Sequence, residues 1–325
     1  MRRLELKGVK TLEMTGEKPF KQAGEKDLFN VICCGVCRTD AKMWNQGHRD
    51  LVLPVVPGHE MILADEKGRM YAVWPGTACG ICRCCKTGRE NLCKHMKIAG
   101  FHRDGGYADR VRVPLENLIP LPAGINPYAA CFAEPVGCVI NAFEKLNLFA
   151  EDRVLIFGGG TMGLITGLVA KQNGQNPVIV EKSREKIERV GPFLEAADLR
   201  CVNKTGETDF NAVINACSDP AAFGLGLEKA GRGAKISFFS GLADNGQTEN
   251  SLLNLIHYKE AEVFGAYGLA RNHTQSAVSF IQKHEGLVRL LIQETVDPAK
   301  APALMEKVLS GRNLKFILDF AGTRL

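Results

Sequence analysis

Three residue types that bind transition metals occur close together near the start of the chain. Cys37 is followed within two dozen residues by His59 and Glu60. Thiolate, neutral imidazole and carboxylate are ligands that zinc takes in proteins, and a catalytic zinc ion keeps one position open for water or substrate. Glycine flanks both segments, as Gly35 and Gly58. We therefore predict a catalytic metal site here.

Two polar residues that follow Cys37 are suited to act beside such a metal. Thr39 supplies a hydroxyl that is able to pass a proton. Asp40 supplies a carboxylate that is able to hold the other ring nitrogen of His59, which is the usual partner arrangement of metal-bound histidines. We predict that both belong to the same catalytic site.

A second group of cysteines has the spacing of a structural zinc site. Eight of the twelve cysteines lie between residues 33 and 93. Four of them have the spacing C-x2-C-x2-C-x7-C, namely Cys79, Cys82, Cys85 and Cys93, and Cys84 is the one left out. Four thiolates on a compact loop close a tetrahedral site and leave no position for substrate. Such clustering in a large chain indicates metal binding rather than a disulfide framework.

A glycine-rich stretch in the middle of the chain has the pattern G-x-G-x-x-G of dinucleotide-binding proteins. It follows a predicted strand at 153–157 and opens a predicted helix at 162–172. In this context the glycines allow a tight turn, a close approach to a pyrophosphate and helix–strand packing, and the helix N-terminus faces the phosphates. The residues assigned to the cofactor are Gly158, Gly160, Thr161, Met162 and Gly163.

Glu181 ends the next predicted strand, eighteen positions beyond Gly163. A carboxylate at this point accepts hydrogen bonds from a ribose 2′-hydroxyl and repels a 2′-phosphate, which favours NAD over NADP. Arg184 lies nearby and keeps NADP open as the alternative.

The two halves of the chain differ in their patterns. Residues 1 to about 125 are rich in short alternating segments, such as 28–32 and 108–113, separated by Gly, Pro and polar clusters. From about residue 152 strands alternate with helices, which predicts an α/β fold with a doubly wound parallel sheet. The later strands are expected at 178–181, 212–215, 235–240 and 263–266, and the later helices at 183–197 and 220–230.

Near the C-terminus the pattern predicts one more helix and a final strand. The helix is expected over 272–283. Residues 315–320 alternate in hydrophobicity, and we expect them to return and pair with the N-terminal β-rich domain.

Composition narrows the possible classes of protein. The chain of 325 residues is long enough for two domains, and 45% apolar with 24% charged residues is typical of soluble globular proteins. The net charge of +5 is scattered, so neither a nucleic-acid nor a membrane footprint is visible. The N-terminus has no apolar stretch of signal-peptide length, and the run at 154–170 is broken by glycines. We expect a cytoplasmic protein.

The order of these features resembles that of the zinc-dependent medium-chain alcohol dehydrogenases, over nearly the whole chain. The carriers are the segments GVCRTD (35–40), GHE (58–60), DGGYA (104–108), AEP (133–135), the cysteine group and the glycine turn. The AEP segment and residues 255–260 are similar to the sorbitol and threonine dehydrogenase branch. The resemblance implies a β-rich, GroES-like catalytic domain at 1–135 and 269–325, and a Rossmann dinucleotide-binding domain at 136–268.

The resemblance also implies roles for single residues. Cys37 and His59 are expected to bind the catalytic zinc, with either Glu60 or Glu134 as the third ligand. Glu134 precedes Pro135, which suits the first turn of a new helix and places the carboxylate between two helical pieces. Arg38 and Lys315 are expected to neutralise the cofactor pyrophosphate.

The expected reaction is hydride transfer between a secondary alcohol (a polyol, sugar or amino alcohol) and NAD, with two zinc ions per chain and Thr39 passing the proton. Lys42 stands where many relatives carry a histidine that ends the proton relay, and His48 is a possible replacement. Relatives form dimers or tetramers, and the apolar region 263–265 is compatible with such an interface.

Two alternative functions remain open. One is an NADPH-dependent carbonyl reductase of the same fold, which comparison of cofactor affinities distinguishes. The other is a zinc-ribbon interaction module joined to a redox-sensing Rossmann domain, which predicts a basic stripe on the cysteine group. The stripe formed by Lys86, Arg89, Lys94 and Lys97 is faint and has no interleaved aromatic residues.

Overall fold

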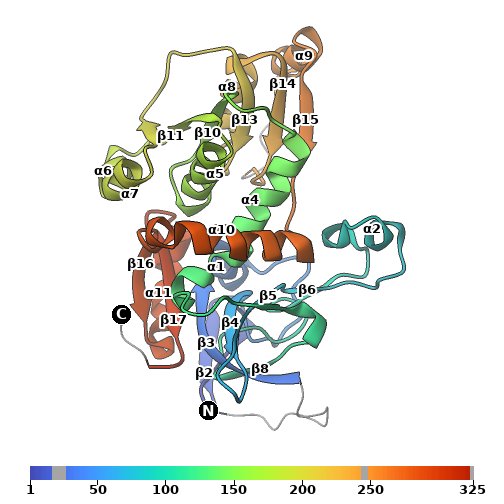
Figure 1. Ribbon diagram of the computed structural model, residues 1–325, viewed down its shortest axis with the longest axis vertical. Coiled ribbons are helices and arrows are strands. Elements are labelled where there is room, and N and C mark those ends of the chain that lie inside the picture. Colours follow the sequence, from blue (N-terminus) through green and yellow to red (C-terminus); the bar gives the residue numbers. More distant parts are fainter. Residues whose placement is uncertain (17–26, 243–247, 323–325) are drawn as a thin grey trace. The chain divides into compact units, whose positions relative to one another are not determined.

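The computed structural model describes residues 1–16, 27–242 and 248–322, which fold into two compact units (Figure 1). Unit 1 comprises Met1–Gly137 and Leu269–Leu325, and unit 2 comprises Cys138–Gly268. No helix among the described residues combines the length and the hydropathy that a membrane crossing needs.

Unit 2 is built on a six-stranded sheet with the order β12-β11-β10-β13-β14-β15, and all neighbouring strands are parallel. This order is that of a doubly wound dinucleotide-binding sheet, so the predicted fold of this half is confirmed. The strands are β10 (Arg153–Phe157), β11 (Asn176–Val180), β12 (Arg200–Val202), β13 (Phe210–Asn215), β14 (Ala230–Phe238) and β15 (Glu262–Gly265). β10 lies at the centre, where Leu155 and Ile156 are fully buried.

The helices predicted at 162–172 and 220–230 are present, whereas no range was predicted for the helix Asn250–Tyr258 or for β12. Residues 183–197 form two helices rather than one, because Pro192 lacks an N–H and its ring is incompatible with a continuing helix. The first ends before Val190, and the second has Pro192 in its first turn. The helices are α5 (Thr161–Gln172), α6 (Arg184–Arg189), α7 (Gly191–Ala196), α8 (Pro220–Lys229) and α9 (Asn250–Tyr258); α4 (Ala133–Leu146) begins in unit 1 and continues into unit 2.

Unit 1 contains a seven-stranded sheet with the order β16-β17-β3-β4-β5-β9, and β8 pairs with β3. The predicted return of the C-terminal strand is confirmed, because β17 pairs antiparallel with β3. The strands are β3 (Leu28–Val36), β4 (Glu60–Ala64), β5 (Met70–Val73), β8 (Arg110–Arg112), β9 (Leu118–Pro120), β16 (Ile292–Val296) and β17 (Lys315–Asp319). A separate pair is formed by β1 (Arg3–Gly8) and β2 (Thr11–Thr15).

Unit 1 also contains α11 (Ala301–Leu309), four further helices and two short strands. These further elements are α1 (Arg38–Gln46), α2 (Arg83–Lys86), α3 (Pro127–Ala130), α10 (Arg271–Arg289), β6 (Gly76–Thr77) and β7 (Lys97–Ile98). The helix predicted at 272–283 is thus present and extends further. β6 and β7 pair antiparallel at the base of the cysteine-rich segment, which carries α2 (Figure 1).

Three adjacent strands bring distant residues to one end of the sheet in unit 1. Within the order β17-β3-β4, Phe316 is opposite Val36 and Gly35 is opposite Glu60. Lys315 begins β17, β3 ends one residue before Cys37, and Glu60 begins β4. The register therefore gathers an amine, a thiol and a carboxylate from three parts of the sequence.

Candidate active site and metal centres

The thiol of Cys37 is held at the N-terminus of α1. Its sulfur accepts a hydrogen bond from the Thr39 N–H at 3.5 Å, and the Asp40 carboxylate accepts one from the Cys37 N–H at 3.0 Å. This reciprocal arrangement is a capping box. The N-terminus of α1 thus directs backbone N–H groups toward the Cys37 sulfur.

Cys37, His59 and Glu60 are brought together as the sequence predicted. Their ligand atoms all lie within 4.8 Å of one another. Ligands at zinc distances in a tetrahedron are about 3.3–3.8 Å apart, so these side chains need only small movements to bind one ion. Cys37 is half-buried, whereas His59 and Glu60 are buried. The donor set and its spacing fit zinc.

A glycine makes room for the Glu60 carboxylate. A Cβ atom at Gly35 would lie 2.2 Å from Glu60 Oε2, so a larger residue at this position would displace the carboxylate. Glu60 Oε1 accepts a hydrogen bond from Lys315 Nζ at 2.7 Å, while buried Oε2 has no hydrogen-bond partner in the described part of the chain. A buried carboxylate oxygen without a donor is costly, and a metal ion would satisfy it.

Asp40 lies behind His59 and joins it to a buried tyrosine. Asp40 Oδ1 is 3.4 Å from His59 Nδ1, which is ion-pairing distance, and Oδ2 accepts a hydrogen bond from the Tyr107 hydroxyl at 2.8 Å. Because Nδ1 faces the carboxylate, Nε2 is the nitrogen available to a metal. Burial alone would raise the pKa of Asp40, but His59 and these hydrogen bonds hold it below its ordinary value.

Replacing Asp40 with asparagine is expected to weaken zinc binding by about 10- to 100-fold, because the imidazole loses the negative partner that orients it. Competition with a chromogenic chelator measures this affinity. Tyr107→Phe is the matched comparison, since it removes one hydrogen bond and keeps the carboxylate charge. We expect a smaller effect in that variant, and equal effects in the two would argue against the orienting role of Asp40.

The other residues predicted for this site lie in different surroundings. Glu134 is the second residue of α4, so it lies inside this helix rather than in the break after α3 where it was expected, and it is not a member of the three-residue group. Thr39 is half-buried and Arg38 is exposed. His48 Nδ1 accepts a hydrogen bond from the Asp50 N–H at 3.2 Å.

Lys315 is buried beside the metal group. Burial alone would lower the pKa of its amine, but Glu60 raises the pKa above its ordinary value, and Cys37 and Glu134 act in the same direction. Its described partner is thus Glu60, and its contact with a pyrophosphate stays a prediction.

The four cysteines chosen by spacing form the second metal group. The ligand atoms of Cys79, Cys82, Cys85 and Cys93 lie within 4.8 Å of one another, and Cys84 is not among them. The sulfurs of Cys82 and Cys85 are 3.4 Å apart. None of the twelve cysteines, all of which are described, forms a disulfide.

Backbone N–H groups prepare part of this group for metal. Hydrogen bonds from the Ile81 and Cys82 backbone lower the pKa of the Cys79 thiol to about 6. Cys93 Sγ accepts N–H hydrogen bonds from Cys79 at 3.3 Å and from His95 at 3.4 Å. Donors directed at sulfur stabilise thiolates, which are the ligands of a structural zinc ion.

The glycine loop in unit 2 has the close contacts that the pattern requires. A Cβ atom at Gly163 would lie 1.7 Å from the Gly158 carbonyl oxygen, and Gly158 has a φ of 109°. Neither position tolerates a side chain without a shift of the backbone. Gly160 precedes α5, so the helix begins within the loop, as predicted.

Glu181 is tied to this loop and to a lysine. Its Oε2 accepts hydrogen bonds from the Gly159 N–H at 2.9 Å and from Lys186 Nζ at 2.6 Å, and its Oε1 accepts one from the Ser183 N–H at 3.0 Å. Burial would raise the pKa of Glu181, but these donors lower it. The carboxylate is therefore ionised beside the loop.

Besides the Lys315–Glu60 ion pair, sequence reasoning missed three contacts of these sites. Phe101 packs its ring against His59 with centroids 5.5 Å apart, Tyr107 bonds to Asp40, and Lys186 pairs with Glu181. Tyr107 lies in the DGGYA segment that carried the resemblance, which was a usable signal. The other two depend on tertiary packing or on a rotamer.

Comparisons with known proteins agree on one family. Residues 27–123 match the model described as "Alcohol dehydrogenase GroES-like domain". An L-galactonate-5-dehydrogenase of Escherichia coli K12 is 31% identical over 268 residues, which cover 79% of this chain and 73% of the relative. An L-threonine 3-dehydrogenase of Chromobacterium violaceum is 26% identical over 97% of this chain and 98% of its own.

A solved structure has the same fold. The acetophenone reductase of Geotrichum candidum, in complex with NAD, superposes with a TM-score of 0.84 at 21% identity and covers 99% of this chain and 98% of its own. At that identity the likeness concerns the fold alone. The sequence relatives carry the assignment further: the chain belongs to the zinc-type medium-chain alcohol dehydrogenase family and is an oxidoreductase of that family.

Proposed function

We propose that the protein transfers a hydride between a secondary alcohol and NAD, using a zinc ion bound by Cys37, His59 and Glu60. The observation that carries this proposal is the convergence of these three ligand atoms within 4.8 Å, with one Glu60 oxygen lacking a donor in the described residues. A bound zinc ion would supply Lewis-acid chemistry by lowering the pKa of an alcohol oxygen.

The chain's own residues have distinct tasks in this scheme. Asp40 fixes the orientation of His59 through Nδ1. The half-buried hydroxyl of Thr39, two residues from the thiolate, takes the proton that the alcohol loses. Arg38 at the start of α1 and Lys315 supply positive charge for a pyrophosphate. The nicotinamide carries the redox chemistry itself.

Glu60 is our choice for the third ligand over Glu134. Glu60 lies in the ligand group, whereas Glu134 acts on the neighbouring Lys315 amine through its charge. The ion pair with Lys315 leaves one Glu60 oxygen for metal and fixes the carboxylate in place. We further propose that Cys79, Cys82, Cys85 and Cys93 hold a second, structural zinc ion.

For the cofactor we propose NAD, with Glu181 as the residue that selects it. Glu181→Ala is expected to weaken NAD binding by about tenfold and to reduce the preference for NAD over NADP, because the repulsion of a 2′-phosphate is lost. Fluorescence titration with each cofactor measures both effects. Glu185→Ala, an exposed carboxylate in α6, is the matched control. An unchanged ratio of the two affinities would exclude this role for Glu181.

One observation favours the NADPH-dependent reductase as the second candidate. Lys186 lies 2.6 Å from the Glu181 carboxylate and neutralises part of its charge. A 2′-phosphate would gain a cation at this place. Tighter binding of NADP than of NAD by the unaltered protein would favour the reductase.

The test of the proposed reaction combines zinc analysis with a panel of polyols, sugars and amino alcohols, each assayed with NAD and NADP. We expect two zinc ions per chain and NAD reduction with a secondary alcohol. Treatment with a strong chelator should remove both zinc ions and abolish the reaction with every member of the panel.

Three further proposals concern the setting of the protein. We propose that unit 1 is the catalytic domain and unit 2 the dinucleotide-binding domain. Free thiols throughout the chain suit a reducing compartment such as the cytoplasm. We propose a homodimer or homotetramer with β15 at the interface, since it is the edge strand of its sheet and Val263 is 41% exposed.

A further inference from the structure

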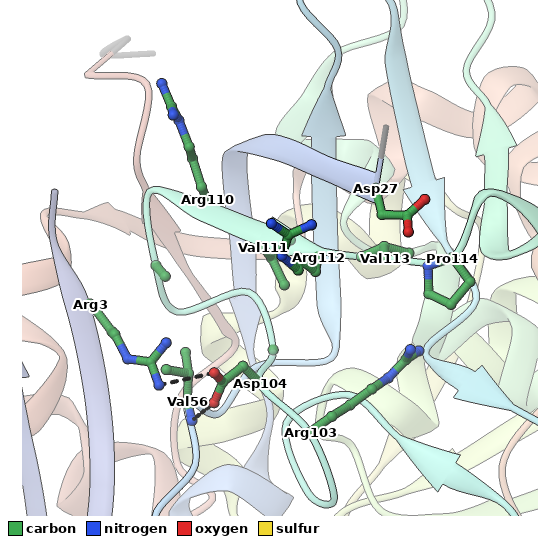
Figure 2. Close-up of a pocket in the computed structure, with 12 residues that line it drawn as sticks. Arg3, Asp27, Val56, Arg103, Asp104, Arg110, Val111, Arg112, Val113 and Pro114 are labelled. Carbon is green, nitrogen blue, oxygen red and sulfur yellow. Dashed lines mark hydrogen bonds and ion pairs between the residues drawn. The ribbon is translucent and has the colours of Figure 1, made fainter. Parts of the chain in front are cut away.

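Unit 1 has a cavity of about 340 Å³ that contains none of the proposed metal ligands. This volume lies within the range of about 300–1,000 Å³ that small-molecule pockets occupy. Four arginines and two aspartates line the cavity together with apolar residues of β8 and of the segments before and after it (Figure 2). The charged lining residues are Arg3, Arg103, Arg110, Arg112, Asp27 and Asp104.

Two of these charges neutralise each other. Arg3 Nη2 lies 2.9 Å from Asp104 Oδ2, and Asp104 Oδ1 accepts a hydrogen bond from the Val56 N–H at 2.9 Å (Figure 2). The Asp104 carboxylate is thus occupied on both oxygens. The other charged residues of the lining are three arginines and one aspartate.

Arg103 is the residue that most needs a ligand. Its Nε and Nη2 atoms are buried, and neither has a hydrogen-bond partner in the described ranges of the chain. Figure 2 shows its side chain extended toward the region of Asp27 and Pro114. Burial lowers the pKa of this guanidinium, which the charge of Glu116 partly offsets. Buried donors without acceptors are costly, and an anion with acceptor oxygens would satisfy both nitrogens together.

The neighbouring arginines Arg110 and Arg112 add positive charge to the lining of the cavity. Arg112 lies on the same strand as Arg110, two residues further on, so both side chains start from one face of β8. Arg110 extends away from Arg103 in Figure 2, and its Nε donates to Asn30 at 3.1 Å. Arg110 therefore contributes mainly through its field.

We propose that this cavity is a binding site for a phosphate group, either free or as a phosphate monoester, with Arg103 as its principal ligand. The planar guanidinium offers two parallel N–H donors that match two phosphate oxygens. Arginines outnumber aspartates in the lining, which suits an anion. The site is separate from the proposed zinc-binding group, so its occupancy does not depend on the hydride-transfer proposal.

Calorimetric titration of the zinc-loaded full chain with inorganic phosphate tests this proposal, at an ionic strength held constant with chloride so that screening does not change. Arg103→Gln is expected to weaken phosphate binding by about 10- to 100-fold, since a charge-assisted bidentate contact is lost. Arg112→Gln should weaken it in the same direction. Arg232→Gln, an exposed arginine of unit 2, is the matched control and should bind as the unaltered protein does.

Three further comparisons separate the outcomes. Thermal unfolding without phosphate shows whether each variant is folded. If the Arg103→Gln variant is not folded, the phosphate affinity of the Arg112→Gln variant tests the proposal instead. Glycerol 2-phosphate distinguishes a monoester site, which binds it at least as tightly as inorganic phosphate, from a site for the free ion. Phosphate binding that persists unchanged in the folded arginine variants, as binding at a zinc ion would, overturns the proposal. Two other results would also overturn it: a titration that does not saturate at millimolar phosphate, and tighter binding of malonate than of phosphate.

Discussion

Replacing Cys37 with serine is expected to lower kcat by about a thousandfold or more and to leave the Kd for NAD within about twofold. The thiolate is one of three proposed zinc ligands, and a hydroxyl is a poor substitute for it. A Lewis acid contributes several kcal/mol to transition-state stabilisation, and each 1.4 kcal/mol corresponds to about tenfold in rate. Steady-state kinetics with the best alcohol of the panel, together with NAD titration, measures the two quantities.

Cys84→Ser is the control for this experiment. Cys84 lies in α2 and belongs to neither group of candidate metal ligands. The kcat and the zinc content of the Cys84→Ser variant should therefore equal those of the unaltered protein. The Cys37 variant should lose one zinc ion per chain and keep the other. Full activity in the Cys37 variant would rule out the proposed metal ligand.

Replacing Cys93 with serine is expected to remove the other zinc ion and to lower stability rather than to alter catalysis directly. Cys93 is 6% exposed, and its sulfur accepts two backbone N–H hydrogen bonds. The binding energy of a structural zinc ion is folding energy. A loss of about 3 kcal/mol shifts the unfolding midpoint of a domain of this size by about 6–12 °C.

Calorimetry and zinc analysis check this second prediction, again with Cys84→Ser as the comparison. Cys84 is adjacent in sequence to Cys85, a member of the four-cysteine group. The Cys93→Ser and Cys84→Ser variants therefore both alter a cysteine of the same segment, but only the first removes a proposed zinc ligand. A similar unfolding midpoint for both variants would show that the four-cysteine group has no structural zinc ion to lose.

Local patterns were sufficient to predict most of unit 2. The strands and helices there alternate in a regular order, and Gly158 and Gly163 of the loop have the steric reasons that the spacing suggests. The exception at Val190 arose because helical periodicity continues through residues 183–197, whereas one proline ends the first helix. The fully buried character of β17 also exceeds what its alternating pattern suggests, since all five of its residues are buried.

The members of the two candidate metal-binding groups were predictable because their residue types and spacing are chemically restrictive. The partners of those ligands were less so, because they come from distant positions in the chain. Lys315 reaches Glu60 only because β17 returns beside β3, and Tyr107 reaches Asp40 across 67 positions in the sequence. The pairing of Lys186 with Glu181 is local, but it depends on a long side chain whose rotamer the sequence does not determine.

Anomalous diffraction at the zinc absorption edge, from crystals of the unaltered protein, is the most direct test of the proposed catalytic centre. The account predicts a peak about 2.3 Å from Cys37 Sγ, about 2.0–2.1 Å from His59 Nε2 and about 2.0–2.2 Å from a Glu60 oxygen. A zinc-loaded crystal in which the only peak lies among the four cysteines, or in which Glu134 replaces Glu60 at the first centre, would contradict it.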